Sequence, residues 1–206
     1  MLGIGKVNLT LILSDFFLQS GLGLTAPLFA IFITGEIKGG SLAMVGLVTA
    51  AYWLTKSIVQ PFIAHFLDIR KGEKDDFKFL VVGMYIANLI PIGYIFSTNI
   101  TQIIILEFIR GLAMACVIPT WAALFTRHMD KGWEAFSWSI ESTGIGLGAG
   151  LAAALGGILV TAFGFDFVFI LVALFGLLAT TTLFGIRRDL FLHNHFAPAV
   201  PLQEKI

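Results

Sequence analysis

The sequence is short of charge and of cysteine, and both shortages narrow what the chain can be. Lysine, arginine, aspartate and glutamate make up 13% of its 206 residues, and the formal net charge is zero. An ordinary water-soluble domain carries about 25% charged residues, and a nucleic-acid-binding surface needs a basic excess. The single cysteine, Cys116, excludes a disulfide within the chain and a zinc site built on several cysteines. We therefore expect neither a soluble globule nor a nucleic-acid-binding protein.

The sequence also lacks the local motifs of common enzyme families. It contains no GxSxG, HExxH or phosphate-binding Walker motif. The glycine spacing from Gly144 is similar to a dinucleotide-binding fingerprint, but it follows no strand and lies in an apolar stretch, so we discount it. His193, Asn194 and His195 are interpreted as a solvated tail rather than as metal ligands. We expect no enzyme activity, no cofactor and no metal centre.

Apolar residues dominate what is present. They make up 57% of the chain, and glycine and phenylalanine are abundant, as in helices that pack in lipid. A spanning helix needs about 20 mostly apolar residues. Six stretches meet this condition: 7–33, 41–67, 79–96, 101–125, 135–163 and 165–186, with a corner at Gly164. The expected fold class is all-α, a polytopic membrane protein with six transmembrane helices.

The six spans form one expected domain, residues 1–186, followed by a loose polar cytoplasmic tail, residues 187–206. The first span is too long for the apolar core of a cleaved signal peptide, so we expect a retained signal anchor. With a cytoplasmic N-terminus, ten lysines and arginines fall in cytoplasmic segments and only Lys38 falls outside. This bias predicts a multi-pass protein of the cell (inner) membrane with both termini cytoplasmic.

Spans one and four share a spacing of acid and proline. Asp15 precedes Pro27 by twelve residues, and Glu107 precedes Pro119 by the same number. In the expected topology these spans run in opposite directions, which is the arrangement of a 3+3 inverted repeat. Prolines within spans bend helices, and bent helices surround a cavity more readily. We predict the repeat, with a chance match as the alternative.

Four segments resemble motifs of the major facilitator superfamily. Residues 107–111 (EFIRG) resemble its fourth-helix motif, and residues 144–157 (GIGLGAGLAAALGG) resemble its glycine-rich fifth helix. Residues 68–74 (DIRKGEK) resemble its cytoplasmic loop between helices two and three, and residues 164–169 resemble its entry to helix six. The resemblance covers one six-helix half of the family's usual twelve helices, and it implies a stand-alone half-length member.

The chain departs from the pattern of that family at three places. Gly72 follows Asp68 by four residues instead of three. Glu107 stands at the usual arginine position of the fourth helix, with Arg110 one turn later. Ala153 replaces a proline of the fifth helix that is associated with antiporters, which argues against antiport.

Charged side chains inside the spans are the candidate functional residues. Each costs about 2.5–3.5 kcal/mol at bilayer depth unless it pairs, is neutralised or faces water. We assign a substrate or proton pathway to five of them and to two amides: Asp15, Gln19, Lys56, Asn88, Glu107, Arg110 and Glu141. Gln60, Trp53 and Trp121 are further lining candidates, with a packing role favoured for the two tryptophans.

Structural roles remain open for the same side chains. Glu107 and Arg110 lie three residues apart on one helix face, so they form a local ion pair, a substrate site, or both in turn. Asp15 is either a proton carrier or a partner of Lys56 or of neighbouring backbone. Glu141 lies near the end of its span, and we favour contact with the surface over coupling to transport.

Two further groups carry expectations about gating and packing. By the family resemblance, Asp68, Arg70, Lys71 and Gly72 form a cytoplasmic gating loop; an ordinary surface loop is the alternative. Small residues at a spacing of four let helices approach closely. They are Gly144, Gly146, Gly148 and Gly150, which pack either within the chain or across a subunit interface.

Together these features predict a secondary active transporter of a small molecule, coupled to protons, with the lipid bilayer and its substrate as partners. The resemblance implies two halves related by an axis along the membrane normal, which two identical chains reproduce as a homodimer. The alternatives are a non-transporting membrane scaffold or assembly partner with the same fold, and a fragment of a longer transporter.

Overall fold

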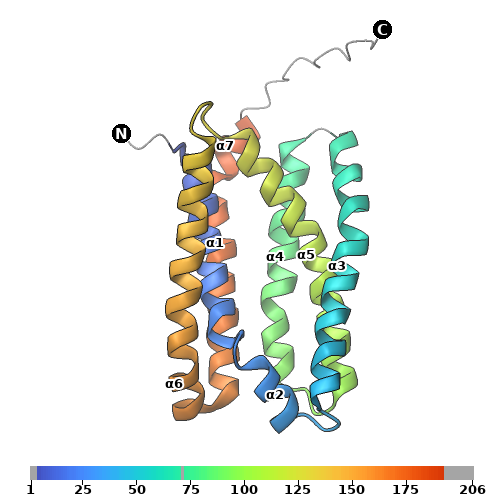
Figure 1. Ribbon diagram of the computed structural model, residues 1–206. Helices are drawn as coiled ribbons and strands as arrows, with labels where there is room; N and C mark the ends of the chain where they lie inside the picture. Colours follow the sequence, from blue (N-terminus) through green and yellow to red (C-terminus); the bar gives the residue numbers. More distant parts are fainter. Residues whose placement is uncertain (1–3, 71, 193–206) are drawn as a thin grey trace.

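The computed structural model describes residues 4–70 and 72–192, which form helices joined by short connections (Figure 1). The elements are α1 (Lys6–Thr25), α2 (Phe29–Glu36), α3 (Leu42–Arg70), α4 (Glu73–Ile95), α5 (Ile100–Arg127), α6 (Glu134–Thr182), the 3-10 turn η1 (Leu183–Ile186) and α7 (Arg187–Leu192). The expected all-α fold class is confirmed.

Within the described residues, five stretches are long and apolar enough to cross a bilayer: Lys6–Thr25, Leu42–Ile69, Glu73–Ile95, Ile100–Arg127 and Glu134–Phe191. The last stretch contains both the fifth and the sixth expected spans, because α6 turns back on itself at Gly164 (Figure 1). Gly164 has a φ of 81°, in the left-handed region that favours glycine. We call residues 134–163 the first limb of α6 and residues 165–182 its second limb.

The first expected span, residues 7–33, is wrong as a continuous helix. The chain leaves the helix after Thr25 and enters α2 at Phe29, so a break surrounds Pro27. Proline has no backbone N–H for the carbonyl four residues earlier, and its ring crowds that carbonyl. By contrast, helices α3, α4 and α5 continue through Pro61, Pro91 and Pro119.

The helices pack as two bundles that stand side by side (Figure 1). In the first bundle, α1 packs along α6: Gly23 meets Ala149 of the first limb, and Gly21 meets Phe175 of the second limb. In the second bundle, α5 packs along both α3 and α4. Helix α4 also packs on α6, so the two bundles are joined through these two helices.

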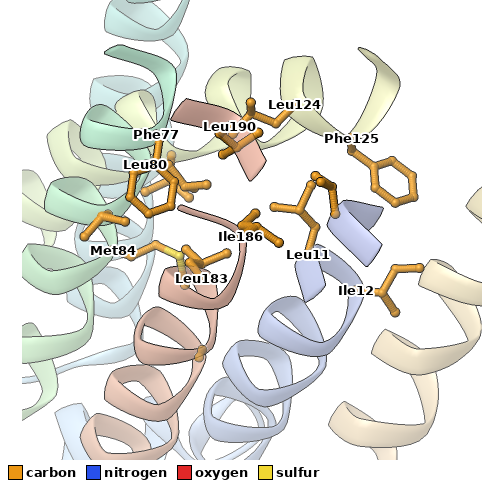
Figure 2. Close-up of a cluster of buried hydrophobic side chains, with 14 of the residues drawn as sticks. Leu11, Ile12, Phe77, Leu80, Met84, Leu124, Phe125, Leu183, Ile186 and Leu190 are labelled. Carbon is orange, nitrogen blue, oxygen red and sulfur yellow. The ribbon is translucent and has the colours of Figure 1, made fainter. Parts of the chain in front are cut away.

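Apolar cores lie at both ends of the bundles. The larger core takes side chains from α1, α4, α5, α6, η1 and α7, and Figure 2 labels these members: Leu11, Ile12, Phe77, Leu80, Met84, Leu124, Phe125, Leu183, Ile186 and Leu190. A second core, around Phe32, Tyr94 and Phe169, lies where α2 meets the end of α4. The ring centroids of Phe32 and Phe169 are 4.8 Å apart, in an edge-to-face contact.

The beginning of α1 and the helix α7 lie at the same end of the molecule. Lys6 Nζ is 2.7 Å from Asp189 Oδ2. Helix α7 contains the first six residues of the segment that we expected to be a loose tail, and its Leu190 is fully buried. Residues 193–206, with His193, Asn194 and His195, lie outside the described residues.

Residues 68–78, which separate the second and third expected spans, are mostly helical, which corrects the sequence boundaries. Helix α3 extends to Arg70 and α4 begins at Glu73, after Gly72. Acidic residues in the first turn of a helix interact favourably with its N-terminal dipole, and Glu73, Asp75 and Asp76 occupy that turn.

At the opposite end, main-chain hydrogen bonds connect the α2–α3 connection to the α4–α5 connection. The Lys38 N–H donates to the Thr98 carbonyl at 3.1 Å, and the Ile100 N–H donates to the Lys38 carbonyl at 3.2 Å. We call this bridge between Lys38 and Asn99 the main-chain clasp. It holds the connection that leads into α3 against the α4–α5 corner of the second bundle.

Candidate functional site

A cavity of about 290 Å³ lies between the two bundles, beside the break between α1 and α2. Helices α1 to α5 and the second limb of α6 all contribute to its wall. The wall is mostly apolar and aromatic, with Phe29, Trp53 and Phe169, and its charged groups are Glu107 and Arg110. The site therefore combines an apolar surface with one ion pair, the usual composition of a small-molecule pocket.

Glu107 is the centre of a three-residue cluster in this wall. The side chain is 1% exposed. Arg110 donates to Glu107 Oε2 from Nη2 at 2.6 Å and from Nε at 3.1 Å, and the Tyr94 hydroxyl donates to Glu107 Oε1. Each carboxylate oxygen has a donor, as a buried charge requires. The local ion pair expected from the sequence spacing is present.

The two cations of the spans, Arg110 and Lys56, lie over aromatic rings of α3. Arg110 Cζ is 4.4 Å from the centroid of the Tyr52 ring, and Lys56 Nζ is 3.8 Å from the centroid of the Trp53 ring. A ring face attracts a cation and replaces part of its lost hydration. Among the described residues no ion pair joins Lys56 to Asp15, so that expected pairing is not formed.

Asp15 of α1 lies against Glu141 of the first limb of α6, so two carboxyl groups meet at the contact between these helices. Gln19 Nε2 is 3.5 Å from Asp15 Oδ1. Glu141 is only 8% exposed, so the surface contact that we favoured is wrong: the side chain points toward α1. A carboxylate only accepts hydrogen bonds. Two carboxylates that face each other repel, and a proton on one of them removes this repulsion.

Asn88 and Trp121 lie in packing contacts rather than in the wall of the cavity. Asn88 Nδ2 donates to the Gly176 carbonyl at 2.8 Å and lies 3.1 Å from Thr180 Oγ1. These bonds join α4 to the second limb of α6. The Trp121 ring stacks on Phe125 with centroids 4.8 Å apart, the role that we favoured from the sequence. Asn88 therefore links the two bundles.

The gating loop expected from the sequence is reduced to a short junction between α3 and α4. Asp68 belongs to the last turn of α3, and Gly72 directly precedes α4. Lys71 and the side chain of Arg70 lie outside the described residues.

Three members of the observed networks were not found from the sequence: Tyr52, Tyr94 and Asp76. Asp76, at the start of α4, pairs with Arg127 at the end of α5, and its side chain is 3% exposed. A buried tyrosine hydroxyl needs a hydrogen-bond partner, so Tyr94 in an apolar span was a signal available in the sequence. The arginine at the end of α5 was another, because α4 and α5 are consecutive antiparallel helices.

The four glycines of the first limb of α6 face different surroundings. A Cβ added to Gly148 would lie 2.5 Å from Ser20 Oγ of α1, whereas one added to Gly144 would have its nearest neighbour at 3.9 Å. Around Gly146 and Gly150 no atom of the described residues lies within 4 Å of such a Cβ. Gly148 thus serves packing within the chain, and Gly146 and Gly150 lie on an open face.

Comparisons with known proteins agree with this arrangement. The family model described as Major Facilitator Superfamily matches residues 11–201. Among curated proteins, the chain is 26% identical over 185 residues to the "Multi-drug resistance efflux pump PmrA homolog" of Lactococcus lactis subsp. lactis (strain IL1403). The match covers 89% of this chain and 43% of that protein. The chain thus spans less than half the length of this curated relative.

Proposed function

The chain belongs to the major facilitator superfamily, a family of membrane transporters rather than enzymes, and on that premise we propose that it is a proton-coupled secondary transporter of a small amphipathic molecule. The observation that carries the proposal is the Tyr94–Glu107–Arg110 cluster in the wall of the cavity. Ionisable residues at bilayer depth are costly, and they mark substrate and ion pathways. A polar group of a substrate in this cavity competes for one partner of the Glu107–Arg110 pair and thereby separates the two side chains.

The substrate class that we propose is an amphipathic organic molecule. Aromatic side chains such as Phe29 and Trp53 provide the apolar wall, and the Glu107–Arg110 pair offers a partner to a charge of either sign. The name of the Lactococcus relative describes a multidrug efflux pump, which supports the same class here. The volume of about 290 Å³ lies near the lower limit of roughly 300–1,000 Å³ for ligand pockets. A facing subunit would enlarge it.

The proton site in this proposal is the Asp15–Glu141 pair. While one proton is shared, the pair carries a single negative charge; without it, two negative charges would face each other at low exposure. Two neighbouring carboxylates cannot both ionise easily. Release of the proton is therefore coupled to a movement that separates α1 from the first limb of α6 or admits water between them.

We propose that the six helices form a 3+3 inverted repeat. Helix α1 packs along both limbs of α6, and α5 packs along both α3 and α4. An inverted repeat relates span one to span four, span two to span five and span three to span six. This exchange converts the packing of α1 on the two limbs of α6 into the packing of α5 on α3 and α4. The acid and proline spacing supports the same alignment, which superimposes Asp15 on Glu107.

The orientation in our proposal places both termini in the cytoplasm of a cell whose inner membrane holds the protein. The start of α1, the α3–α4 junction, the α5–α6 connection and α7 lie at one end of the bundles (Figure 1). Most lysines and arginines of the connections belong to this end, and Lys38 lies at the other. The positive-inside rule assigns the basic end to the cytoplasm.

A second copy of the chain completes the transporter in this proposal, with a two-fold axis along the membrane normal. The cavity would then lie on the axis between two sets of charged residues. The open face at Gly146 and Gly150 supports a close helix contact there, because small residues let backbones approach each other. Alternating access follows from rocking one copy against the other.

The test is uptake of a lipophilic cationic dye by proteoliposomes with an imposed pH gradient. We expect uptake by the parent and by Asp130→Asn, a control in the α5–α6 connection, and loss of uptake by Glu107→Gln and Asp15→Asn. Equal dye and proton flux in all four proteins, or in empty liposomes, would contradict transport and favour the scaffold.

Oligomeric state is tested separately. In a Cys116→Ser background, Gly146→Cys should give a crosslinked dimer in membranes, whereas Ser139→Cys, about two turns away toward the N-terminus of the same limb, serves as a position control. A monomer that still transports would contradict the homodimer and leave the transport proposal intact.

A further inference from the structure

We propose that the end of the molecule around α7 holds the headgroup of an anionic phospholipid. The site is formed by Lys74 of α4 and by Arg187 and Arg188 of α7, beside the rings of Phe184 and Phe191. It is distinct from the cavity between the bundles and does not depend on transport.

Two of these cations share one aromatic ring. Lys74 Nζ lies 5.4 Å from the centroid of the Phe191 ring, and Arg187 Cζ lies 5.5 Å from the same centroid. Each of these two positive charges therefore raises the electrostatic free energy of the other. The attraction of a partly exposed ring for a cation is weak, so an anion is needed to balance the cluster.

The acids nearby have other partners. Asp189 of α7 pairs with Lys6. In α4, Asp76 pairs with Arg127, Asp75 pairs with Lys78, and Glu73 lies 3.8 Å from His128 Nε2. Within the part of the chain that the structure describes, Lys74, Arg187 and Arg188 form no ion pair with an acid. The cluster therefore presents net positive charge.

The shape beside these cations suits a lipid better than a free anion. A hollow of about 530 Å³ is bounded by Phe184, Arg187, Arg188 and Phe191. Phe77 supports it from α4, because its ring meets those of Phe184 and Phe191 edge to face at 6.0 and 6.1 Å. A guanidinium group can donate two parallel hydrogen bonds to two oxygens of one phosphate. The phenyl rings provide an apolar surface for the glycerol and the upper acyl chain.

The position along the chain agrees with that occupant. The apolar second limb of α6 and η1 end at Ile186, and the basic residues follow at once. Charged residues directly after a span lie at the level of the lipid headgroups. A phospholipid can therefore bind at this site while its acyl chains remain in the bilayer.

The experiment measures phospholipid binding to the purified full chain in mild detergent. Phosphatidylglycerol and phosphatidylcholine are titrated separately, and bound lipid is counted by native mass spectrometry alongside the midpoint of thermal unfolding. The parent is compared with the double variant Arg187→Gln/Arg188→Gln and with a matched control, Lys38→Gln/Lys131→Gln, which removes two charges elsewhere.

We expect the parent and the control to bind phosphatidylglycerol more tightly than phosphatidylcholine. Each basic residue near an anionic lipid surface contributes about a fivefold gain in affinity, so the double variant should bind phosphatidylglycerol about 25-fold more weakly. Arg187→Lys/Arg188→Lys should retain most of the affinity, and it separates loss of charge from damage to the fold.

Three results would overturn the proposal. One is equal affinity of the parent for both lipids. Another is unchanged phosphatidylglycerol binding in the Arg187→Gln/Arg188→Gln variant. The third is displacement of phosphatidylglycerol by inorganic phosphate at equal concentration, which would assign the site to a soluble anion instead.

Discussion

The two bundles differ in what surrounds their buried acidic side chains. In the second bundle, Glu107 is balanced by Arg110 and by the Tyr94 hydroxyl. In the first bundle, Asp15 faces another acid, Glu141. The ion pair is neutral as it stands, whereas two facing carboxylates repel each other unless one of them takes up a proton. In our proposal this difference assigns the exchange of a partner for substrate to the first of these sites, and the gain and loss of a proton to the second.

The largest effect should follow from removing the cation of the second bundle. Arg110→Leu leaves Glu107 buried without its partner, and breaking a buried pair in this way costs about 3–5 kcal/mol of unfolding free energy. The double variant Glu107→Gln/Arg110→Leu removes both charges and should be clearly more stable than the single variant. The measurement is unfolding in detergent followed by intrinsic fluorescence. Equal stability of the single and double variants would show that Glu107 is not charged in the parent.

The second effect compares how closely the two bundles pack. A Cβ on Gly156 would lie 2.1 Å from the Leu24 carbonyl oxygen in the first bundle, and one on Gly111 would lie 2.8 Å from the Tyr52 carbonyl oxygen in the second. Gly156→Ala should cost about 1–3 kcal/mol, and Gly111→Ala less. Gly157→Ala is the matched control, because nothing lies within 4 Å of its added Cβ; helix propensity then makes it neutral or stabilising. Thermal midpoints in the reverse order would show that the first bundle is the looser one.

A smaller effect is expected at the contact between the bundles. Asn88→Ala removes the hydrogen bonds from α4 to the Gly176 carbonyl and to Thr180. The loss should be about 1–2 kcal/mol, since Thr180 retains its bond to the Gly176 carbonyl. Hydrogen exchange should rise in α4 and in the second limb of α6 together. A rise confined to one of these helices would mean that Asn88 does not link the bundles.

The smallest effect on stability, and a large one on activity, is expected for the carboxyl pair. Asp15→Asn keeps a donor for Glu141 and should change the unfolding free energy by less than about 1 kcal/mol. Dye uptake driven by a pH gradient should disappear, whereas exchange of labelled for unlabelled dye at equal pH should continue. Loss of both activities would assign Asp15 to the substrate site instead of the proton site.

Interactions within one helix were predictable from the sequence, and those between distant helices were not. The Glu107–Arg110 pair follows from a spacing of three residues on one helix face. The contact of Asp15 with Glu141 depends on which faces of two helices meet, and the depth of Glu141 in its span does not reveal that direction. The close approach of α1 to α6, through Gly23 and Gly148, decides it.

The prolines teach the same distinction. The sequence locates Pro27 and Pro119 in spans and predicts bends, but only the tertiary structure decides whether a helix ends. A freed carbonyl in a membrane helix needs another donor from its surroundings. Two prolines at matching positions can therefore differ in their effect on the helix: the helix stops near Pro27 and continues through Pro119. The corner at Gly164 was predictable, because a turn between two apolar runs favours glycine.

The main-chain clasp between Lys38 and Asn99 has a consequence for how mutations there will behave. Both of its hydrogen bonds use backbone atoms, so side-chain identity is nearly irrelevant to it. Proline is the exception, because it removes the N–H that Lys38 and Ile100 each donate. A saturation mutagenesis map would thus record the clasp as two columns tolerant of most amino acids and intolerant of proline, a signature that alanine scanning cannot detect.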